Sequence, residues 1–519
     1  MSTPRVTDRS EESATRHVLS LIRENERRFG EYAALVYEGR RFTNLELFRE
    51  SRRFAAALAG AGVAPGDRVV VHVPNCPQVW VTYLACCRLG AVVVPAPSSL
   101  AAGELGFILQ DSEANVVVTG SEQAEKVLGL READPGLEHV IVADGTVAGA
   151  TAYRTLLDAA HHELEGEVGT EDDLAGLIYT SGTTGPPKGV MLTHRNFWAQ
   201  AVASHRIYVT PEEDARENTF LMPLSLSHIF GLYVTVASLV MGNTMVMMRR
   251  FAAEEALRLI AEHEVRIVPA VPTMLIQMLG VPDAARLARS VLQWDCGGAP
   301  LPLEVLDAVQ ARLGGMVCEG WGLSETTGPA ANATRDLPQK KGSVGPVMRG
   351  IALEVKVVDD ADREVRPREL GEFVVRGDTV MAGYWRRPDA TAEAMRGGWF
   401  HTGDVGYMDE EGFAYVVDRK KDLILRGGEN IAPHEVEDVL YRHPAVLEAA
   451  VVGLPDPVYG QRVVAFVVAN EVATASADEV RAHCGDHLKP SKVPEEIRFL
   501  PDLPKNSAGK ILKTELRTL

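Results

Sequence analysis

Two kinds of apolar pattern alternate along the first third of the chain. Residues 68–73 (RVVVHV) and 91–96 (AVVVPA) are short apolar runs typical of buried strands, and residues 79–89 between them have the length and composition of a helix. A strand, a helix and a strand in this order predict a βαβ unit and a parallel sheet. Further strands of the same kind are expected at 114–119, 140–143, 265–271 and 292–296.

Thr43 marks the expected start of one helix. Glu46 follows three residues later and completes a capping box, in which each side chain bonds the other residue's backbone N–H. Leu47, Phe54 and Leu58 then fall on one helical face, which we expect to be buried.

An uncharged run covers residues 229–248 (IFGLYVTVASLVMGNTMVMM), and 20 residues are enough to span a membrane as a helix. However, Gly242 and Asn243 interrupt the run. A buried helix followed by a methionine-rich strand explains both pieces, and we favour this interpretation over a membrane span.

The pattern changes near residue 351. Shorter strands separated by Gly- and Asp-rich turns predict a β-rich subdomain at about 351–420, and a mixed pattern follows over 421–519. With 519 residues, the chain is long enough for two or more domains. We therefore expect an α/β protein, with a large N-terminal domain of stacked α/β subdomains over 1–420 and a small α+β C-terminal domain.

Composition excludes some classes of function. The formal net charge of −18 disfavours a general nucleic-acid-binding surface, although a local pocket on an acidic protein can still bind a small anion. None of the six cysteines forms a C-x-x-C pair, so a zinc ribbon is not indicated. The N-terminus has no apolar signal region, and reduced, buried thiols favour a cytoplasmic protein.

The most informative segment is residues 179–190 (YTSGTTGPPKGV). Glycines allow backbone N–H groups to converge on phosphate oxygens, hydroxyl groups add donors, and Lys188 adds positive charge. The segment follows an apolar run at 174–178, which we expect to be a strand. It differs from the common P-loop, because Gly189 rather than Ser or Thr follows the lysine. We therefore predict a phosphate-binding loop of another type.

This segment closely resembles the signature of the adenylate-forming (ANL) superfamily, which includes acyl-CoA synthetases, luciferases and the adenylation domains of peptide synthetases. Matching motifs recur in order as far as Lys510, over almost the whole chain. The resemblance implies a mobile C-terminal lid domain with a hinge near Lys421. It also implies ATP, Mg²⁺ and coenzyme A as cofactors or cosubstrates.

The resemblance assigns roles to individual residues. Lys188 and Thr184 would act on the phosphates, Glu325 and Thr184 would bind Mg²⁺, and Lys510 would contact the α-phosphate and the acid carboxylate. His228 would gate the acid pocket. The remaining predicted contacts with ATP or coenzyme A are Thr180, Ser181, Gly182, Thr183, Gly185, Gly298, Ala299, Pro300, Glu319, Trp321, Gly322, Ser324, Asp404, Arg419, Lys421, Gly427 and Gly428.

Within that set, three positions have more specific implied roles. Asp404 would bind both ribose hydroxyls, and Arg419 would make a second ribose or phosphate contact. Trp321 would lie near the adenine, where the family more often has Tyr. Gly427 and Gly428 would line the pantetheine path of coenzyme A.

One segment departs from the family pattern. Many acyl-CoA synthetases carry P-L-F-H, whereas this chain has two extra residues in Pro223-Leu-Ser-Leu-Ser-His228. The insertion leaves the exact role of His228 and the shape of the acid pocket open. A buried histidine of purely structural role fits nearly as well.

The expected activity is an AMP-forming acid–thiol ligase. It would join a carboxylic acid, fatty or aryl, to AMP with release of pyrophosphate, and then transfer the acyl group to coenzyme A. Three alternatives remain: transfer to a carrier-protein thiol, transfer to an amine (including with a small acid such as nitrite), and a non-catalytic nucleotide-binding homologue. The sequence does not identify the acid, and a homodimer remains open.

Overall fold

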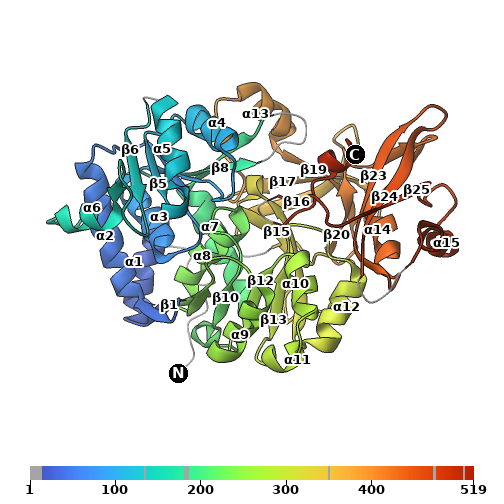
Figure 1. Ribbon diagram of the computed structural model, residues 1–519, viewed down its shortest axis with the longest axis horizontal. Helices are drawn as coiled ribbons and strands as arrows, with labels where there is room; N and C mark the ends of the chain where they lie inside the picture. Colours follow the sequence, from blue (N-terminus) through green and yellow to red (C-terminus); the bar gives the residue numbers. More distant parts are fainter. Residues whose placement is uncertain are drawn as a thin grey trace.

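The computed structural model describes residues 15–133, 136–166, 168–180, 186–348, 351–470, 475–506 and 509–519. Its strands form four sheets, two of eight strands in the first part of the chain, one of four strands after residue 351, and one of five strands near the C-terminus. Figure 1 shows the C-terminal part, with α14 and β23, at one side of the larger body.

The first large sheet has the strand order β18-β9-β8-β4-β3-β5-β6-β7. The neighbours from β8 to β7 pair in parallel, while β9 pairs antiparallel with β8. The strands are β3 (Arg68–His72), β4 (Val92–Pro95), β5 (Val116–Thr119), β6 (His139–Val142), β7 (Thr151–Ala152), β8 (Leu174–Thr180), β9 (Lys188–Thr193) and β18 (Gly383–Tyr384). The predicted βαβ rhythm is confirmed here, with α3 (Pro77–Leu89) between β3 and β4.

The second large sheet has the order β15-β14-β13-β12-β10-β11-β1-β2 and is parallel except at its two ends. Its strands are β1 (Ala33–Tyr37), β2 (Arg40–Thr43), β10 (Phe220–Met222), β11 (Met245–Met247), β12 (Ile267–Ala270), β13 (Gln293–Cys296), β14 (Met316–Leu323) and β15 (Gly328–Asn332). The carboxyl ends of β13 and β14 carry two of the predicted motifs, which is the edge where ligands bind in open α/β sheets.

Helices fill the space between the two large sheets and cover their outer faces. The central layer, which forms the largest hydrophobic core, contains α1 (Val18–Phe29), α2 (Asn44–Gly60), α3, α7 (His194–Tyr208) and α8 (Ile229–Met241). Helices α4 (Ala102–Ser112) and α5 (Ala124–Ala133) cover the first sheet. Helices α9 (Ala253–His263), α10 (Pro272–Leu279), α11 (Ala284–Leu287) and α12 (Leu303–Arg312) cover the second. The expected stacked α/β architecture is confirmed.

The predicted β-rich segment forms the four-stranded antiparallel sheet β16-β17-β19-β20. Its strands are β16 (Leu353–Val358), β17 (Gly371–Gly377), β19 (Phe400–Met408) and β20 (Ala414–Arg419), and α13 (Pro388–Ala394) lies between β18 and β19 in the chain. The last two strands carry Asp404 and Arg419, which pair with each other in the ladder.

The C-terminal part has a core of its own. Strands β21 (Ile424–Arg426), β22 (Glu429–Ile431), β23 (Val446–Asp456), β24 (Gly460–Ala469) and β25 (Glu496–Leu500) form its sheet. Helices α14 (Pro433–Tyr441) and α15 (Ala477–His487) pack on one face, and the C-terminal segment with α16 (Lys513–Leu516) packs on the other. We call residues after 421 the small domain and the preceding residues the large domain.

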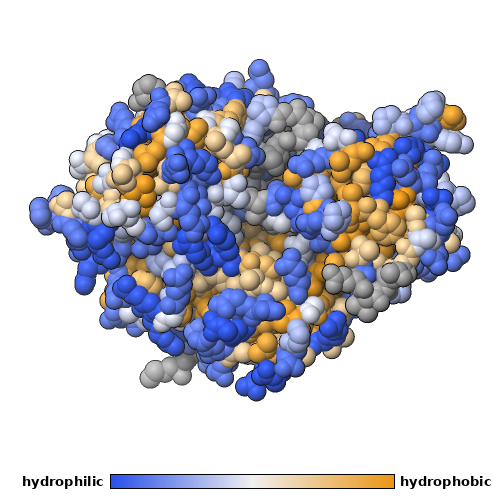
Figure 2. Space-filling view, viewed as in Figure 1, coloured by the Kyte–Doolittle hydropathy of each residue, from blue (hydrophilic) through white to orange (hydrophobic). Residues whose placement is uncertain are grey.

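Several large apolar side chains of the small domain are exposed, and hydrophobic surface is visible around β23 and β24 in the space-filling view (Figure 2). These side chains are Leu425, Leu447, Val458, Tyr459 and Phe499. Scattered exposed apolar residues are ordinary, so this surface alone indicates no partner.

Two local predictions from the sequence are confirmed. Thr43 and Glu46 form the capping box of α2, and Leu47, Phe54 and Leu58 are buried. The uncharged run forms α8 and then β11, joined at Gly242, whose φ of 65° suits the left-handed end of a helix. Among the described residues, no helix is both long and apolar enough to cross a membrane.

Four histidines in the large domain are held in their neutral form by burial. Burial lowers the pKa of His194 to about 3, and those of His72, His205 and His228 to about 4. The ring of His194 stacks on His17 with 3.6 Å between centroids, and its ring nitrogens have no hydrogen-bond partner among the described residues. Because the unfolded chain binds these protons near pH 6.5, acid favours unfolding.

We predict that the protein loses stability as the pH falls from about 6.5 toward 4, and that His194→Phe reduces this loss. The variant keeps a ring against His17 but has no proton to bind, so its loss between pH 7 and 5 should be about 1–2 kcal/mol smaller. Urea unfolding at both pH values measures this. His161→Phe, at an exposed position, is the control. Equal losses in the wild type and His194→Phe would contradict the prediction.

Candidate active site

The predicted phosphate loop connects two paired strands. Strand β8 ends at Thr180 and β9 begins at Lys188, and these two residues are partners in the antiparallel ladder. The expected strand before the loop is therefore confirmed. The predicted contacts Ser181, Gly182, Thr183, Thr184 and Gly185 lie outside the described residues.

Glu325, the predicted Mg²⁺ ligand, is held by a tyrosine that sequence reasoning missed. The hydroxyl of Tyr384 donates to Glu325 Oε1 at 2.9 Å, and Lys188 Nζ lies 5.0 Å from the centroid of the Tyr384 ring. Glu325 and Ser324 belong to a 3₁₀ turn directly after β14. The only local signal for Tyr384 is an aromatic residue after a glycine in the two-residue strand β18.

Asp404 links three parts of the large domain. Its carboxylate accepts a hydrogen bond from Trp321 Nε1 at 2.8 Å and pairs with Arg419 Nε at 2.7 Å. Asp404 and Trp321 are only 4% and 7% exposed, so both contacts are shielded from water. The ring of Trp321 also packs on Phe373 at 4.8 Å. Trp321 thus orients Asp404, a contact that the sequence did not indicate.

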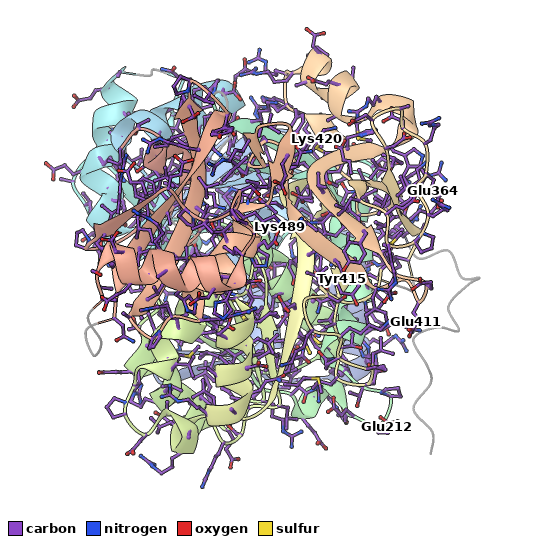
Figure 3. The ribbon with its side chains drawn as sticks, turned by 90° about the vertical axis from the view of Figure 1, so that its right-hand side faces the viewer. Glu212, Glu364, Glu411, Tyr415, Lys420 and Lys489 are labelled. Carbon is purple, nitrogen blue, oxygen red and sulfur yellow. The ribbon has the colours of Figure 1, made fainter. Side chains whose placement is uncertain are left out.

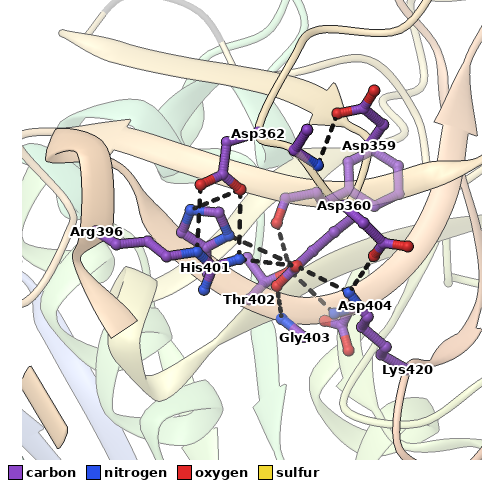
Figure 4. A network of polar contacts seen from close by, with 12 residues as sticks. Asp359, Asp360, Asp362, Arg396, His401, Thr402, Gly403, Asp404 and Lys420 are labelled. Carbon is purple, nitrogen blue, oxygen red and sulfur yellow. Dashed lines mark hydrogen bonds and ion pairs between the residues drawn. The ribbon is translucent and has the colours of Figure 1, made fainter. Parts of the chain in front are cut away.

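Further polar contacts fix the first half of β19, just before Asp404 (Figure 4). Gly403 donates its N–H to Glu372 Oε1 at 3.0 Å, and Thr402 Oγ1 donates to the Phe373 carbonyl at 2.7 Å and accepts from the Asp404 N–H at 3.1 Å. Lys420 Nζ donates to Asp360 at 2.8 Å on the same side. The contacts of Gly403 and Thr402 hold the backbone that carries Asp404.

Val271 brings two predicted motifs together. Val271 lies just before α10. A Cβ atom built on Gly298 would be 3.6 Å from Val271 Cγ1. A Cβ atom built on Gly509 would be 3.5 Å from Val271 Cγ2. Gly298 lies in the turn after β13 with Ala299 and Pro300, and is exposed. The lysine loop of the small domain therefore lies against the predicted adenine turn.

Lys510 lies close to the Asp404 cluster. Its side chain is accessible, yet the surrounding protein restricts its hydration, and this desolvation lowers the pKa of Lys510 to about 8. The nearby charges of Arg419 and Lys421 act in the same direction, whereas Asp404 acts against them. Desolvation and Arg419 also lower the pKa of Lys421. The site thus gathers three cations near the carboxylates of Asp404 and Asp422.

Glu319 and Gly322 lie on β14, on either side of Trp321. Gly322 is exposed, and a Cβ there would be 2.0 Å from the Gly328 carbonyl oxygen, so only glycine fits. Burial, with the nearby Asp438 carboxylate, raises the pKa of Glu319 to about 8. Glu319 is therefore mostly a neutral acid at pH 7.

The atypical segment before His228 is a packed loop between β10 and α8. Asn75 donates to the Leu224 carbonyl at 2.7 Å and accepts from the Leu226 N–H at 2.9 Å, while Tyr83 donates to the Leu226 carbonyl at 2.9 Å. His228 is the N-cap residue of α8 and is half-buried. The role of His228 stays a prediction.

Gly427 and Gly428 form the two-residue turn between β21 and β22, with φ of 55° and 85°. Positive φ at both positions is typical of a type I′ hairpin turn. The Gly427 N–H donates to the Tyr459 carbonyl at 2.8 Å, so this contact of the turn lies within the small domain.

In the side view, Lys489 of the small domain and Tyr415 and Lys420 of the β-rich subdomain lie on the face toward the viewer (Figure 3).

The site suits Mg²⁺ that is bound mainly through phosphates. Among the described residues, no group of three or more His, Cys, Asp or Glu side chains is arranged to hold a metal. Tyr384 occupies one oxygen of Glu325 and leaves the other for a hard cation. Mg²⁺ usually takes only one or two protein carboxylates together with substrate phosphates.

Comparison with known proteins agrees with this geometry. The family model of the AMP-binding enzymes matches residues 22–385, and the model of the AMP-binding enzyme C-terminal domain matches residues 435–510. The chain belongs to the AMP-binding enzyme family.

This AMP-binding enzyme is 34% identical to a long-chain-fatty-acid–CoA ligase of Bacillus subtilis (strain 168), over 96% of this chain and 93% of that protein. It is 38% identical to a feruloyl-CoA synthase of Amycolatopsis sp, over 93% and 95%. Among solved structures it resembles o-succinylbenzoate CoA synthetase from Bacillus subtilis in complex with the acyl-adenylate intermediate. That match has a TM-score of 0.82 and 33% identity, and it covers 96% and 97% of the two chains.

The expected family, fold and activity are confirmed. The AMP-binding enzyme is an AMP-forming acid–thiol ligase that converts a carboxylic acid to an acyl-adenylate and then to an acyl-CoA, with ATP, Mg²⁺ and coenzyme A. Transfer to a carrier protein or an amine, and the non-catalytic alternative, are not favoured.

We predict that Lys510 reacts with an amine-directed acylating reagent with a midpoint near pH 8, as its lowered pKa requires. Competitive labelling followed by peptide mass spectrometry measures this in the ligand-free protein. Free Nα-acetyl-lysine, with a side-chain pKa of about 10.4, serves as the comparison and should react with a midpoint well above that of Lys510. Identical pH profiles for Lys510 and this compound would contradict the desolvated position of Lys510 beside the Asp404 cluster.

Proposed function

We propose that adenylation takes place between the phosphate loop, the Asp404 cluster and Lys510. The observation that carries this proposal is the convergence of Lys510, Arg419 and Lys421 on the Asp404 carboxylate. Asp404 binds the ribose hydroxyls, because a carboxylate accepts two hydroxyl donors. Lys510 contacts the α-phosphate and the acid carboxylate.

The first step needs alignment rather than a base. A carboxylic acid with a pKa of roughly 4–5 is already ionised at pH 7, so its oxygen attacks the α-phosphorus directly, and pyrophosphate leaves. Two anions must approach each other, and Lys510 and Lys188 neutralise charge where they meet. Glu325 would hold Mg²⁺ together with the phosphates, and the ion would supply further positive charge there.

The second step requires the same groups to move apart. The thiol of coenzyme A attacks the acyl carbonyl and AMP leaves. We propose that the small domain turns about Lys421, within the turn that joins β20 to β21, so that Lys510 withdraws and the Gly427–Gly428 turn approaches. Support comes from the small domain's separate core.

Lys510→Ala should lower acid-dependent pyrophosphate release by about 100-fold or more, because one charge-stabilising group is removed. Lys421→Pro should leave this step close to wild type but strongly slow thioester formation, since proline fixes φ at the hinge. Pyrophosphate release and the reaction of preformed acyl-adenylate with coenzyme A are measured separately.

Lys421→Ala removes the same side chain but leaves the backbone free, so it separates the effect of the charge from that of the hinge. Equal losses in both steps for Lys421→Pro would exclude the hinge assignment.

For the acid, we propose an aryl substrate bound beside α8. The rings of Phe230 and Tyr233 are stacked, with centroids 5.5 Å apart and planes 4° from parallel. Phe230 is half-buried and its ring edge lies beside Gly297, at the predicted adenine turn, while the Tyr233 ring lies against Gly328. Behind them, the Tyr208 hydroxyl is 3.3 Å from that of Tyr233 and donates to Asp295 at 2.8 Å. This buried polar group favours a short, flat acid over a long alkyl chain.

A panel of about thirty acids, assayed for pyrophosphate release with and without coenzyme A, tests this proposal. We expect benzoate- and cinnamate-type acids to exceed octanoate in kcat/KM. Phe230→Leu keeps an apolar side chain but removes the ring, so the aryl-to-octanoate ratio should fall by about 2- to 10-fold. A wild-type preference for octanoate would reject the aryl assignment without affecting the adenylation chemistry.

We also propose a cytoplasmic location. The support is chemical, because all six cysteines are free and buried, as is usual in a reducing compartment.

A further inference from the structure

One ion pair joins the two domains between α12 and α14. Arg442 Nε lies 2.9 Å from Glu304 Oε1. Glu304 lies in the first turn of α12 in the large domain, and Arg442 is the C-cap residue of α14 in the small domain. The pair therefore connects the start of one helix to the end of another across the interface.

Each of the two charges also suits its own helix. A carboxylate is favourable at a helix N-terminus and a guanidinium at a helix C-terminus, because each opposes the partial charge of the exposed backbone groups. The Glu304 side chain is 36% exposed and the Arg442 side chain is 43% exposed. A half-exposed ion pair adds little to overall stability, which suits a contact that forms and breaks in every catalytic cycle.

The position of Lys510 depends on how the small domain as a whole is placed, because the small domain is one packed body. Helix α14 covers one face of its sheet through Val436 and Leu440, and the segment after Lys510 covers the other face through Leu516. Anchoring the end of α14 to α12 thus fixes the sheet and, through it, the lysine loop. In this arrangement the loop contacts the large domain, since a Cβ on Gly509 would lie 3.0 Å from Thr273 Oγ1.

Like charges at the same interface oppose the pair. Burial and the nearby Glu304 raise the pKa of Asp438 on α14, while Arg442 and His434, whose Nε2 is 3.6 Å from Asp438 Oδ2, act against this. Asp438 also contributes to the raised pKa of Glu319 in the large domain. Arg442 therefore offsets the repulsion between the Glu304 and Asp438 carboxyl groups where the two domains meet.

We propose that the Glu304–Arg442 pair holds the small domain in the adenylate-forming arrangement, and that Arg442 is a positioning residue that acts through the placement of Lys510. This inference rests on the proposed two-step function, in which the pair must separate before thioester formation.

Charge reversal tests the proposal. Glu304→Arg and Arg442→Glu should each lower the rate of acid-dependent pyrophosphate release by about fivefold, the effect expected for a pair of this exposure. The reaction of preformed acyl-adenylate with coenzyme A should be unchanged or faster. The double variant Glu304→Arg/Arg442→Glu restores attraction and should recover at least half of the lost adenylation rate.

A second measurement is independent of catalysis. If the pair holds Lys510 beside the Asp404 cluster, either single reversal should shift the labelling midpoint of Lys510 upward from about pH 8. The double reversal should bring the midpoint back to the wild-type value. The matched control is Arg481→Glu on α15, which breaks a pair with Asp478 inside the small domain and should change neither readout.

The results separate failure of this inference from failure of the proposed function. Single reversals that leave both adenylation and Lys510 labelling unchanged would overturn the proposal, as would equal losses in both half-reactions without recovery in the double variant. If no acid is adenylated by the wild type, the proposed acid site fails, and the labelling series alone still decides whether the pair positions Lys510.

Discussion

Asp404 is a buried carboxylate, and a buried charge is stable only where protein groups replace the water it has lost. Its replacements come from different parts of the large domain: Trp321 from the second large sheet, and Arg419 from the strand that leads into the small domain. Removing either partner would leave an uncompensated charge in a site that is 4% exposed. The need to satisfy this one carboxylate therefore fixes how the β-rich subdomain meets the sheet and where the small domain begins.

The cations gathered near Asp404 are poorly balanced without a substrate. Lys510, Lys421 and Arg419 lie near two carboxylates, those of Asp404 and Asp422, and desolvation and mutual repulsion still lower the pKa values of both lysines. A polyphosphate anion would relieve that repulsion. The protein as a whole is acidic, with a net charge of −18, so the positive region is local and selects a small anion.

The sequence predicted features that depend on neighbouring residues. The capping box at Thr43 and the helix-to-strand change at Gly242 have local signals, and so does the strand that precedes the phosphate loop. The order of the motifs predicted the family and hence which segments meet. What the sequence could not predict were contacts between distant residues of ordinary type, such as Tyr384 with Glu325 and Arg442 with Glu304. The residues next to Tyr384 on β18, or next to Arg442 at the end of α14, form no local pattern that indicates which distant residue each side chain contacts.

The division of the chain at residue 421 has a consequence for how such an enzyme changes over evolution. The residues proposed to select the acid, Phe230 and Tyr233, lie on a helix in the central layer of the large domain, whereas Lys510 belongs to a body with its own core. If these two proposals hold, a substitution on α8 alters the range of acids without disturbing the small domain that is proposed to turn between the two steps. In this architecture the specificity for the acid can therefore evolve through a few substitutions on α8, while the sequence of the small domain is retained.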